Sequence, residues 1–149
     1  MALDLDEKAV ASARDNLGLN GAEKAVVIKH ADVFEELRAC DREGRKYDMA
    51  VLDPPKLASG PDEAEDALKT YFDLNRLAIA AVAPGGLFIT CSCSGAVPAG
   101  RWHQVVRQAA AAAGRTLAVF ESSGPPADHP VSSDFPQGQY LKTLFARVD

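Results

Sequence analysis

The stretch Tyr47-Asp48-Met49-Ala50-Val51-Leu52-Asp53-Pro54-Pro55-Lys56 decides the fold class of this chain. Its first six residues form an apolar, β-type run that predicts a buried strand. Two prolines follow, and because proline has no amide hydrogen to donate to a ladder, the chain must leave the sheet there. The stretch therefore predicts a strand whose carboxyl end presents Asp53, and open α/β sheets bind their ligands at the carboxyl ends of strands.

On either side of this stretch, short β-type runs alternate with stretches of helical periodicity. Such alternation predicts βαβ units, and hence a three-layer α/β sandwich with a mostly parallel sheet and helices on both faces. The last two strands have no helix between them, so we expect them to pair antiparallel. Strands are predicted at residues 2–5, 26–28, 47–52, 87–91, 116–120 and 140–148, helices at 10–17, 33–45, 62–83 and 102–113, and a turn at 84–86.

The composition is that of an ordinary globular protein: of 149 residues, 25% are charged and 47% are hydrophobic. This balance excludes collagen-like, disordered and disulfide-scaffold proteins, and the lack of a repeat or linker predicts one domain over residues 1–149. No apolar run approaches the roughly 20 residues that span a bilayer, so we expect no membrane partner. The first residues lack the features of a signal peptide, and three cysteines are too few for a disulfide framework, which together predict a cytoplasmic location.

Acidic or reactive side chains follow four successive predicted strands. In chain order they are Asp4 with Asp6, then Asp32, then Asp53, and finally Cys93. An acid at the end of an early strand can accept hydrogen bonds from the ribose hydroxyls of a nucleoside-type cofactor, and Asp32 can accept from an adenine amino group. The alternative for Asp4, Asp6 and Asp32 is helix N-capping, since each precedes a helical stretch.

Cys93 is the candidate nucleophile. It lies just beyond an apolar strand, in Ser92-Cys93-Ser94-Gly95, where a thiolate at the strand end is accessible. The alternative is a buried structural cysteine, and that role suits Cys91 and Cys40 better. No metal site is predicted, because Cys-x-Cys lacks a second cysteine pair and the three histidines lie in unrelated segments.

The motifs at the ends of the four predicted strands, taken in chain order, resemble those of the class I S-adenosylmethionine (SAM)-dependent methyltransferases. They resemble most of all those of the large-subunit ribosomal RNA cytosine-C5 group. The resemblance implies a Rossmann-like methyltransferase fold. Enzymes that methylate exocyclic amines carry an aromatic residue after the two prolines, whereas this chain has Lys56, which disfavours that chemistry. The segments that carry the resemblance are Leu3-Asp4-Leu5-Asp6, His30-Ala31-Asp32-Val33-Phe34, Val51-Leu52-Asp53-Pro54-Pro55-Lys56, Cys91-Ser92-Cys93-Ser94-Gly95 and residues 128–142.

The resemblance implies a role for each motif. Asp53 and Cys93 are the implied catalytic residues: the thiolate attacks C6 of cytosine, which lets C5 take the methyl group, and the carboxyl group stabilises charge on the ring. The base has to leave its stack to reach them. The implied SAM-binding residues are Asp4, Leu5, Asp32, Val33, Asp53 and Pro54, and the implied contacts to the target base are Pro55, Lys56, Ser92 and Ser94.

The family's first strand and its Gly-rich loop have no counterpart in residues 1–149. That strand is normally central, so we expect unpaired ladder groups on two strands and weak or no SAM binding, unless rearrangement or a homodimer closes the gap. The net charge of −5 and a pI of about 5.2 argue against strong RNA affinity, so a missing N-terminal region is expected to hold the RNA. Two alternatives stay open: a class I methyltransferase for another base or a small molecule, and a catalytically silent fragment that self-associates.

Overall fold

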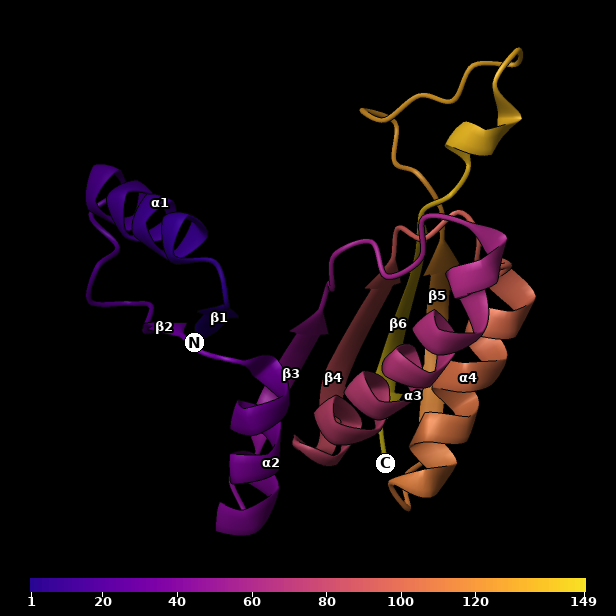
Figure 1. The fold of residues 1–149 in the computed structure, drawn as a ribbon. Coiled ribbons are helices and arrows are strands. Elements are labelled where there is room, and N and C mark those ends of the chain that lie inside the picture. The colour runs from indigo at the N-terminus through magenta and orange to yellow at the C-terminus, as the bar shows by residue number, and fades with distance from the viewer. The chain divides into compact units, whose positions relative to one another are not determined.

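The computed structural model describes residues 1–149 (Figure 1). The chain divides into two compact units, Met1–Glu43 and Gly44–Asp149. The first unit holds β1 (Ala2–Asp4), α1 (Glu7–Leu19), β2 (Ile28–His30) and α2 (Val33–Glu43). The second holds β3 (Tyr47–Leu52), η1 (Pro61–Glu63), α3 (Ala64–Ala80), β4 (Val82–Ser92), α4 (Ala99–Ala112), β5 (Leu117–Ser123), η2 (Pro136–Gly138) and β6 (Lys142–Val148).

The unit Met1–Glu43 is a βαβ arrangement followed by a helix. Its two short strands pair in parallel, from Ala2 opposite Ile28 to Asp4 opposite His30. Asp6 begins α1, because its carboxylate accepts hydrogen bonds from the backbone amides of Lys8 and Ala9. The strand β2 lies two residues later than the predicted run at 26–28.

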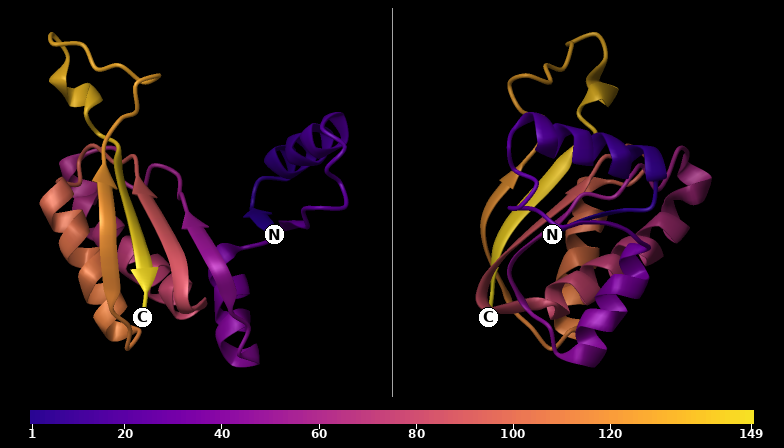
Figure 2. Two further views of the ribbon diagram at one scale, coloured as in Figure 1. Left: turned by 180° about the vertical axis from the view of Figure 1, so that it is seen from behind. Right: turned by 90° about the vertical axis from the view of Figure 1, so that its left-hand side faces the viewer.

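The unit Gly44–Asp149 is built on a four-stranded sheet with the order β3-β4-β6-β5. The pair β3·β4 is parallel, while β6 runs antiparallel to both of its neighbours, which confirms the antiparallel pairing predicted for the last two strands. Both helices of this unit, α3 and α4, lie on one face of its sheet; the view from behind in Figure 2 shows the strands in front of them.

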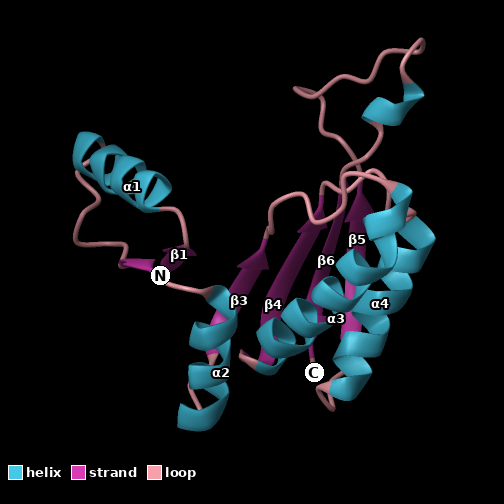
Figure 3. Cartoon of the chain, viewed as in Figure 1, coloured by secondary structure: helices cyan, strands magenta, loops and turns pink.

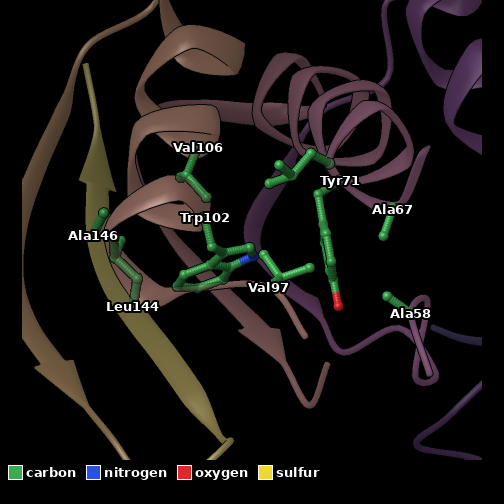
Figure 4. Packing of buried hydrophobic residues seen from close by; sticks show 9 residues of the cluster. Ala58, Ala67, Tyr71, Val97, Trp102, Val106, Leu144 and Ala146 are labelled. Atoms are coloured by element: carbon green, nitrogen blue, oxygen red, sulfur yellow. The ribbon is translucent and has the colours of Figure 1, made fainter. Parts of the chain in front are cut away.

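The core of this second unit lies between the sheet and the two helices. Along β4 the buried positions alternate, with Phe88, Thr90 and Ser92 facing the helices. Trp102 of α4 and Tyr71 of α3 are fully buried and pack with small apolar side chains (Figure 4). Burying side chains of this size contributes on the order of 2–3 kcal/mol each through the hydrophobic effect.

The junction between α3 and β4 differs from the prediction. The helix ends at Ala80, and β4 begins at Val82 and includes the Pro84-Gly85-Gly86 sequence that was predicted to be a turn. Gly85 has a φ of 79°, which favours glycine. At Gly86 a Cβ atom would lie 2.6 Å from Val82 Cγ1 and 2.9 Å from the Asp48 carbonyl oxygen, so glycine lets β3 and β4 approach each other.

The strands form two sheets that share no hydrogen-bonded strand pair. Two of the four strand pairs are parallel, so the strands are mixed in direction rather than mostly parallel. Each unit keeps a parallel strand pair that presents its carboxyl ends on one side, which is the feature that positions a ligand site in α/β folds. None of the helices combines the length and the apolar character that crossing a membrane requires.

Candidate active site

The predicted catalytic residues lie at one edge of the four-stranded sheet. Because β3 and β4 are parallel, the loops that follow them emerge at the same edge, and these loops carry Asp53 and Cys93. The antiparallel strand β6 begins at that edge, so the long segment between β5 and β6 also lies there (Figure 3). Three segments distant in sequence therefore converge at the carboxyl end of β4.

A cavity of about 560 Å³ opens between these segments. Four of the predicted site residues line it, from the loops after β3 and β4. The rest of its wall comes from the segment between β5 and β6, where the rings of His129 and Tyr140 meet edge to face with centroids 5.7 Å apart. The lining residues are Asp53, Pro54, Pro55, Cys93, Pro126, Asp128, His129, Tyr140 and Leu141.

Ser94 ties the proline loop to the cysteine loop. Its hydroxyl oxygen accepts hydrogen bonds from the backbone amides of Leu57 at 3.0 Å and Ala58 at 3.2 Å. A third hydrogen bond of 3.0 Å joins it to the Tyr71 hydroxyl of α3. Since all of these groups are shielded from solvent, losing one partner would leave unsatisfied polar groups behind. The network fixes the two loops that present Asp53 and Cys93.

The three cysteines have different surroundings. Cys93 is half-buried and lines the cavity, whereas Cys40 is fully buried in the other unit. Cys91 lies on β4, and burial raises the pKa of its thiol, although a hydrogen bond with Thr143 opposes this. A raised pKa keeps a thiol protonated and unreactive at neutral pH. The structural role predicted as the alternative therefore suits Cys91 and Cys40, and Cys93 is the thiol with access to a cavity.

Three of the residues predicted to contact a target base do not line the cavity. Ser92 and Ser94 are fully buried, and the Ser92 hydroxyl oxygen accepts a hydrogen bond from the Ser94 amide at 3.4 Å. Lys56 is exposed and lies outside the cavity wall. Both serine side chains lie on the buried side that faces the helices, as the alternation along β4 predicts. They therefore support the loops from the core. Of this predicted group, only Pro55 reaches the cavity.

The predicted cofactor acids of the first unit lie at the carboxyl ends of β1 and β2. One oxygen of Asp32 accepts hydrogen bonds from the amides of Phe34 at 2.8 Å and Glu35 at 3.2 Å, so it caps α2, which begins at Val33. One oxygen of Asp4 accepts from the amide of Asp6 at 2.8 Å. N-capping therefore describes Asp6 and Asp32, but each of Asp4 and Asp32 keeps a second carboxylate oxygen that no protein group engages.

The Leu5 side chain is 65% exposed, and its carbonyl oxygen accepts a hydrogen bond of 2.9 Å from His30 Nε2. This bond joins the loops that follow β1 and β2. Two free carboxylate oxygens beside parallel strand ends fit the hydroxyl and amino donors of a nucleoside.

No role was predicted for the part of the cavity wall that lies between β5 and β6. Asp128, His129 and Tyr140 belong to the C-terminal segment that took part in the resemblance, but periodicity says nothing about where a long loop folds. The available signal was chemical: a histidine and a tyrosine in an otherwise Pro-, Gly- and Ser-rich loop that leads into a strand.

The chain has the Rossmann-like α/β fold of methyltransferases. Over 97% of its length it superposes on 37% of a proposed SAM-dependent methyltransferase from Streptococcus mutans with a TM-score of 0.75 and 18% identity. A second proposed methyltransferase, solved with S-adenosyl-L-homocysteine, superposes with a TM-score of 0.73 over 97% of this chain and 38% of its own, also at 18% identity. At such identities the likeness establishes the fold.

Several sequence relatives share one name. The chain is 42% identical over 147 residues to ribosomal RNA large subunit methyltransferase I of Shewanella denitrificans, and 40% identical over 148 residues to the protein of that name in Aeromonas salmonicida. Each alignment covers 98% of this chain and 37% of the relative, so the chain spans little more than a third of their length. No family model matches the chain.

Proposed function

We propose that this chain is the catalytic part of a SAM-dependent RNA methyltransferase that methylates C5 of a cytosine through a covalent adduct with Cys93. The observation that carries the proposal is that Asp53 and Cys93, which follow different strands, line one cavity. The sequence relatives, which carry the name of ribosomal RNA methyltransferases, support an RNA substrate. The cavity is concave and formed by loops on a rigid sheet edge, as small-molecule and base-binding sites commonly are.

The proposed chemistry explains why a thiol and a carboxyl group are needed together. C5 of cytosine is a weak nucleophile until a group adds at C6. The Cys93 thiolate forms a bond to C6, and the Asp53 carboxyl group stabilises the charge that develops on the ring. C5 then takes the methyl group, the C5 proton leaves, and the Sγ–C6 bond breaks to release Cys93 as thiolate. SAM, when bound, supplies the methyl group as a sulfonium.

The walls of the cavity suit a base that has left its stack. Pro54 and Pro55 offer a rigid surface without amide hydrogens, and Tyr140 and His129 offer aromatic edges and faces. Aromatic side chains stack on bases with energies of about 1–3 kcal/mol per base. We therefore extend the proposed base-binding residues to His129 and Tyr140. Ser92 and Ser94 act by holding the loops in place.

The first unit carries the residues proposed to hold the nucleoside part of SAM. The unengaged oxygen of Asp4 would accept from the ribose hydroxyls, and that of Asp32 from the adenine amino group, with Leu5 and Val33 beside them. In the second unit, Asp53 and Pro54, which directly follow β3, are the remaining residues predicted to bind SAM. The RNA itself we assign to surfaces in the portion of the relatives that has no counterpart here, since this chain has a net charge of −5.

The test is covalent trapping. The chain is incubated with a large excess of SAM, because the sequence predicts weak SAM binding, and with large-subunit ribosomal RNA fragments that contain 5-fluorocytidine, whose fluorine blocks the final proton loss. We expect a SAM-dependent protein–RNA adduct that Cys93→Ser abolishes and the matched control Cys91→Ser retains. The Shewanella denitrificans relative serves as the assay's positive control.

Nucleoside mass spectrometry on unmodified RNA gives the second readout, with 5-methylcytidine as the expected product. Methyl transfer that survives Cys93→Ser would overturn the covalent mechanism. A different methylated nucleoside would favour the alternative of another target base.

A further inference from the structure

Lys142 is a buried lysine at the edge of the cavity wall. It is the first residue of β6, directly after the cavity residues Tyr140 and Leu141, and it pairs with Ser92 across the β4·β6 ladder. Its relative exposure is 7%. Lysine is almost never this buried unless it is paired, because removing an ammonium group from water is costly.

Two backbone carbonyls of the turn after β4 receive this ammonium group. Its Nζ donates hydrogen bonds to the carbonyl oxygen of Ser94 at 2.9 Å and to that of Val97 at 3.0 Å. Cys93 directly precedes this turn, so the lysine and the Ser94 hydroxyl hold the cysteine loop from two sides. An ammonium group has three donors, and these two bonds use two of them.

The electrostatics join Lys142 to Cys93. Burial lowers the pKa of Lys142, and the attraction of Cys93 opposes that shift. An electrostatic attraction acts on both groups, so the ammonium group of Lys142 also attracts a thiolate at Cys93. The carbonyl contacts keep the ammonium group where this attraction acts.

We propose that Lys142 is a positioning residue for the reaction: its two carbonyl hydrogen bonds fix the turn that follows Cys93, and they place its ammonium group where it attracts the Cys93 thiolate. The inference rests on the proposed nucleophilic role of Cys93. The proposal explains why a charged side chain is buried here, although neither the proposed cofactor binding nor the proposed base binding uses it. A neutral apolar residue would fill the same space but would leave both carbonyls unpaired and the thiolate without a cation.

Other titratable groups surround the pair. On α4, His103 has a pKa lowered mainly by burial and further by Arg107 and by Lys142, so it does not supply the positive charge at neutral pH. Asp53 and Cys91 lie close enough to interact with each other, and Cys91 also interacts with Cys93. The Tyr71 hydroxyl is engaged with Ser94. Lys142 is therefore the cation of this set.

Alkylation of Cys93 tests the proposal without RNA or SAM. In the full chain with Cys40→Ser and Cys91→Ser, iodoacetamide labels Cys93 alone, forming an Sγ–carbon bond as iodide leaves. At pH 7.5 we expect Lys142→Met to slow labelling about threefold or more, a change in the range of single charge pairs. The rates should converge at alkaline pH, where the thiolate forms without help. Lys142→Arg should label near the parent rate, as should Lys69→Met, which removes an exposed lysine.

Lys142→Gln keeps a hydrogen-bond donor for the carbonyls and removes the charge, so it serves if Lys142→Met fails to fold by far-UV circular dichroism. The expected result for Lys142→Gln is also slow labelling at pH 7.5. Labelling of the neutral variants at the parent rate would overturn the proposal. Slowing by the same factor at every pH would overturn the proposed role of the charge, because that pattern reports only a displaced loop. Failure of RNA trapping with this labelling pattern intact would count against the methyltransfer proposal alone.

Discussion

Residues 1–43 bury three apolar side chains, Val10, Leu37 and Cys40, whereas residues 44–149 bury twenty, among them Trp102 and Tyr71. Large exposed apolar side chains occur in both units, among them Leu19 at 85% in the first and Phe120 at 63% in the second. The helices of the first unit begin at capping carboxylates, and short helices held mainly by caps are marginal without tertiary packing. The difference in burial indicates that the first unit is the less stable of the two. The proposed nucleoside contacts belong to this unit, and the proposed cysteine chemistry belongs to the better packed one.

The largest effect is expected from emptying the core of the second unit. Trp102→Ala should lower the free energy of unfolding by about 3–5 kcal/mol, because it leaves a cavity at a fully buried site. Val10→Ala, the matched change in the first unit, should cost about 0.5–3 kcal/mol. Urea denaturation followed by far-UV circular dichroism measures both. Equal losses would show that the two units share one core.

Gly86 tests how closely β3 and β4 pack. Gly86→Ala should destabilise by about 1–3 kcal/mol, since the added Cβ would lie 2.9 Å from the backbone oxygens of Ala83 and Asp48. Gly100→Ala is the control: it lies in α4 with no atom within 4 Å of an added Cβ, and alanine favours helix. Thermal or urea unfolding distinguishes them, and a neutral Gly86→Ala would mean that the second unit is looser than its packing indicates.

Ser94 tests whether the loops that follow β3 and β4 depend on the core beside them. Ser94→Ala removes an acceptor for two amides and the partner of the Tyr71 hydroxyl, so it should cost about 1–3 kcal/mol in urea unfolding. Ser59→Ala, at an exposed serine in the same loop region, should stay within about 0.5 kcal/mol of the parent. Equal behaviour of the two variants would contradict a supporting role for Ser94.

The smallest effect is expected from His103, whose pKa burial lowers below 6.5 in the folded state. The unfolded chain then binds the proton more tightly, so this contribution to stability is present above pH 6.5 and is lost as the pH falls through the folded-state pKa. His103→Gln should flatten that part of the stability profile, measured as melting temperature at several pH values. A variant with the parent's slope below pH 6.5 would assign the acid sensitivity to other groups.

The strand β3 was predicted at its observed bounds, and two residues explain why. Tyr47 begins an apolar run, and Pro54 ends hydrogen-bonded pairing by its chemistry alone. The end of α3 was predicted at residue 83 because apolar residues continue past Ala80 without a break. In the structure β4 begins at Val82, and Gly86 lies close to Asp48 of β3. This is a tertiary contact, so the local sequence does not reveal it.

The candidate site was predictable where it follows strands. Asp53 and Cys93 come directly after β3 and β4, so the parallel pairing of these strands brings them to one edge. His129 and Tyr140 were not predictable, because the fold of a long loop depends on what it packs against. The burial of Ser94 was equally hidden, since a serine beside a reactive cysteine has the same sequence whether it faces a ligand or the core.

The pairing of Lys142 with the turn after Cys93 also sets an order of events during synthesis. Lys142 follows Cys93 by about 50 residues, so at roughly 5–20 residues per second the thiol is made several seconds before its cation. Until β6 docks beside β4, the nascent chain presents Cys93 without the carbonyl-bound lysine. The carbonyl contacts that hold the turn after Cys93 are therefore among the last that the folding chain forms.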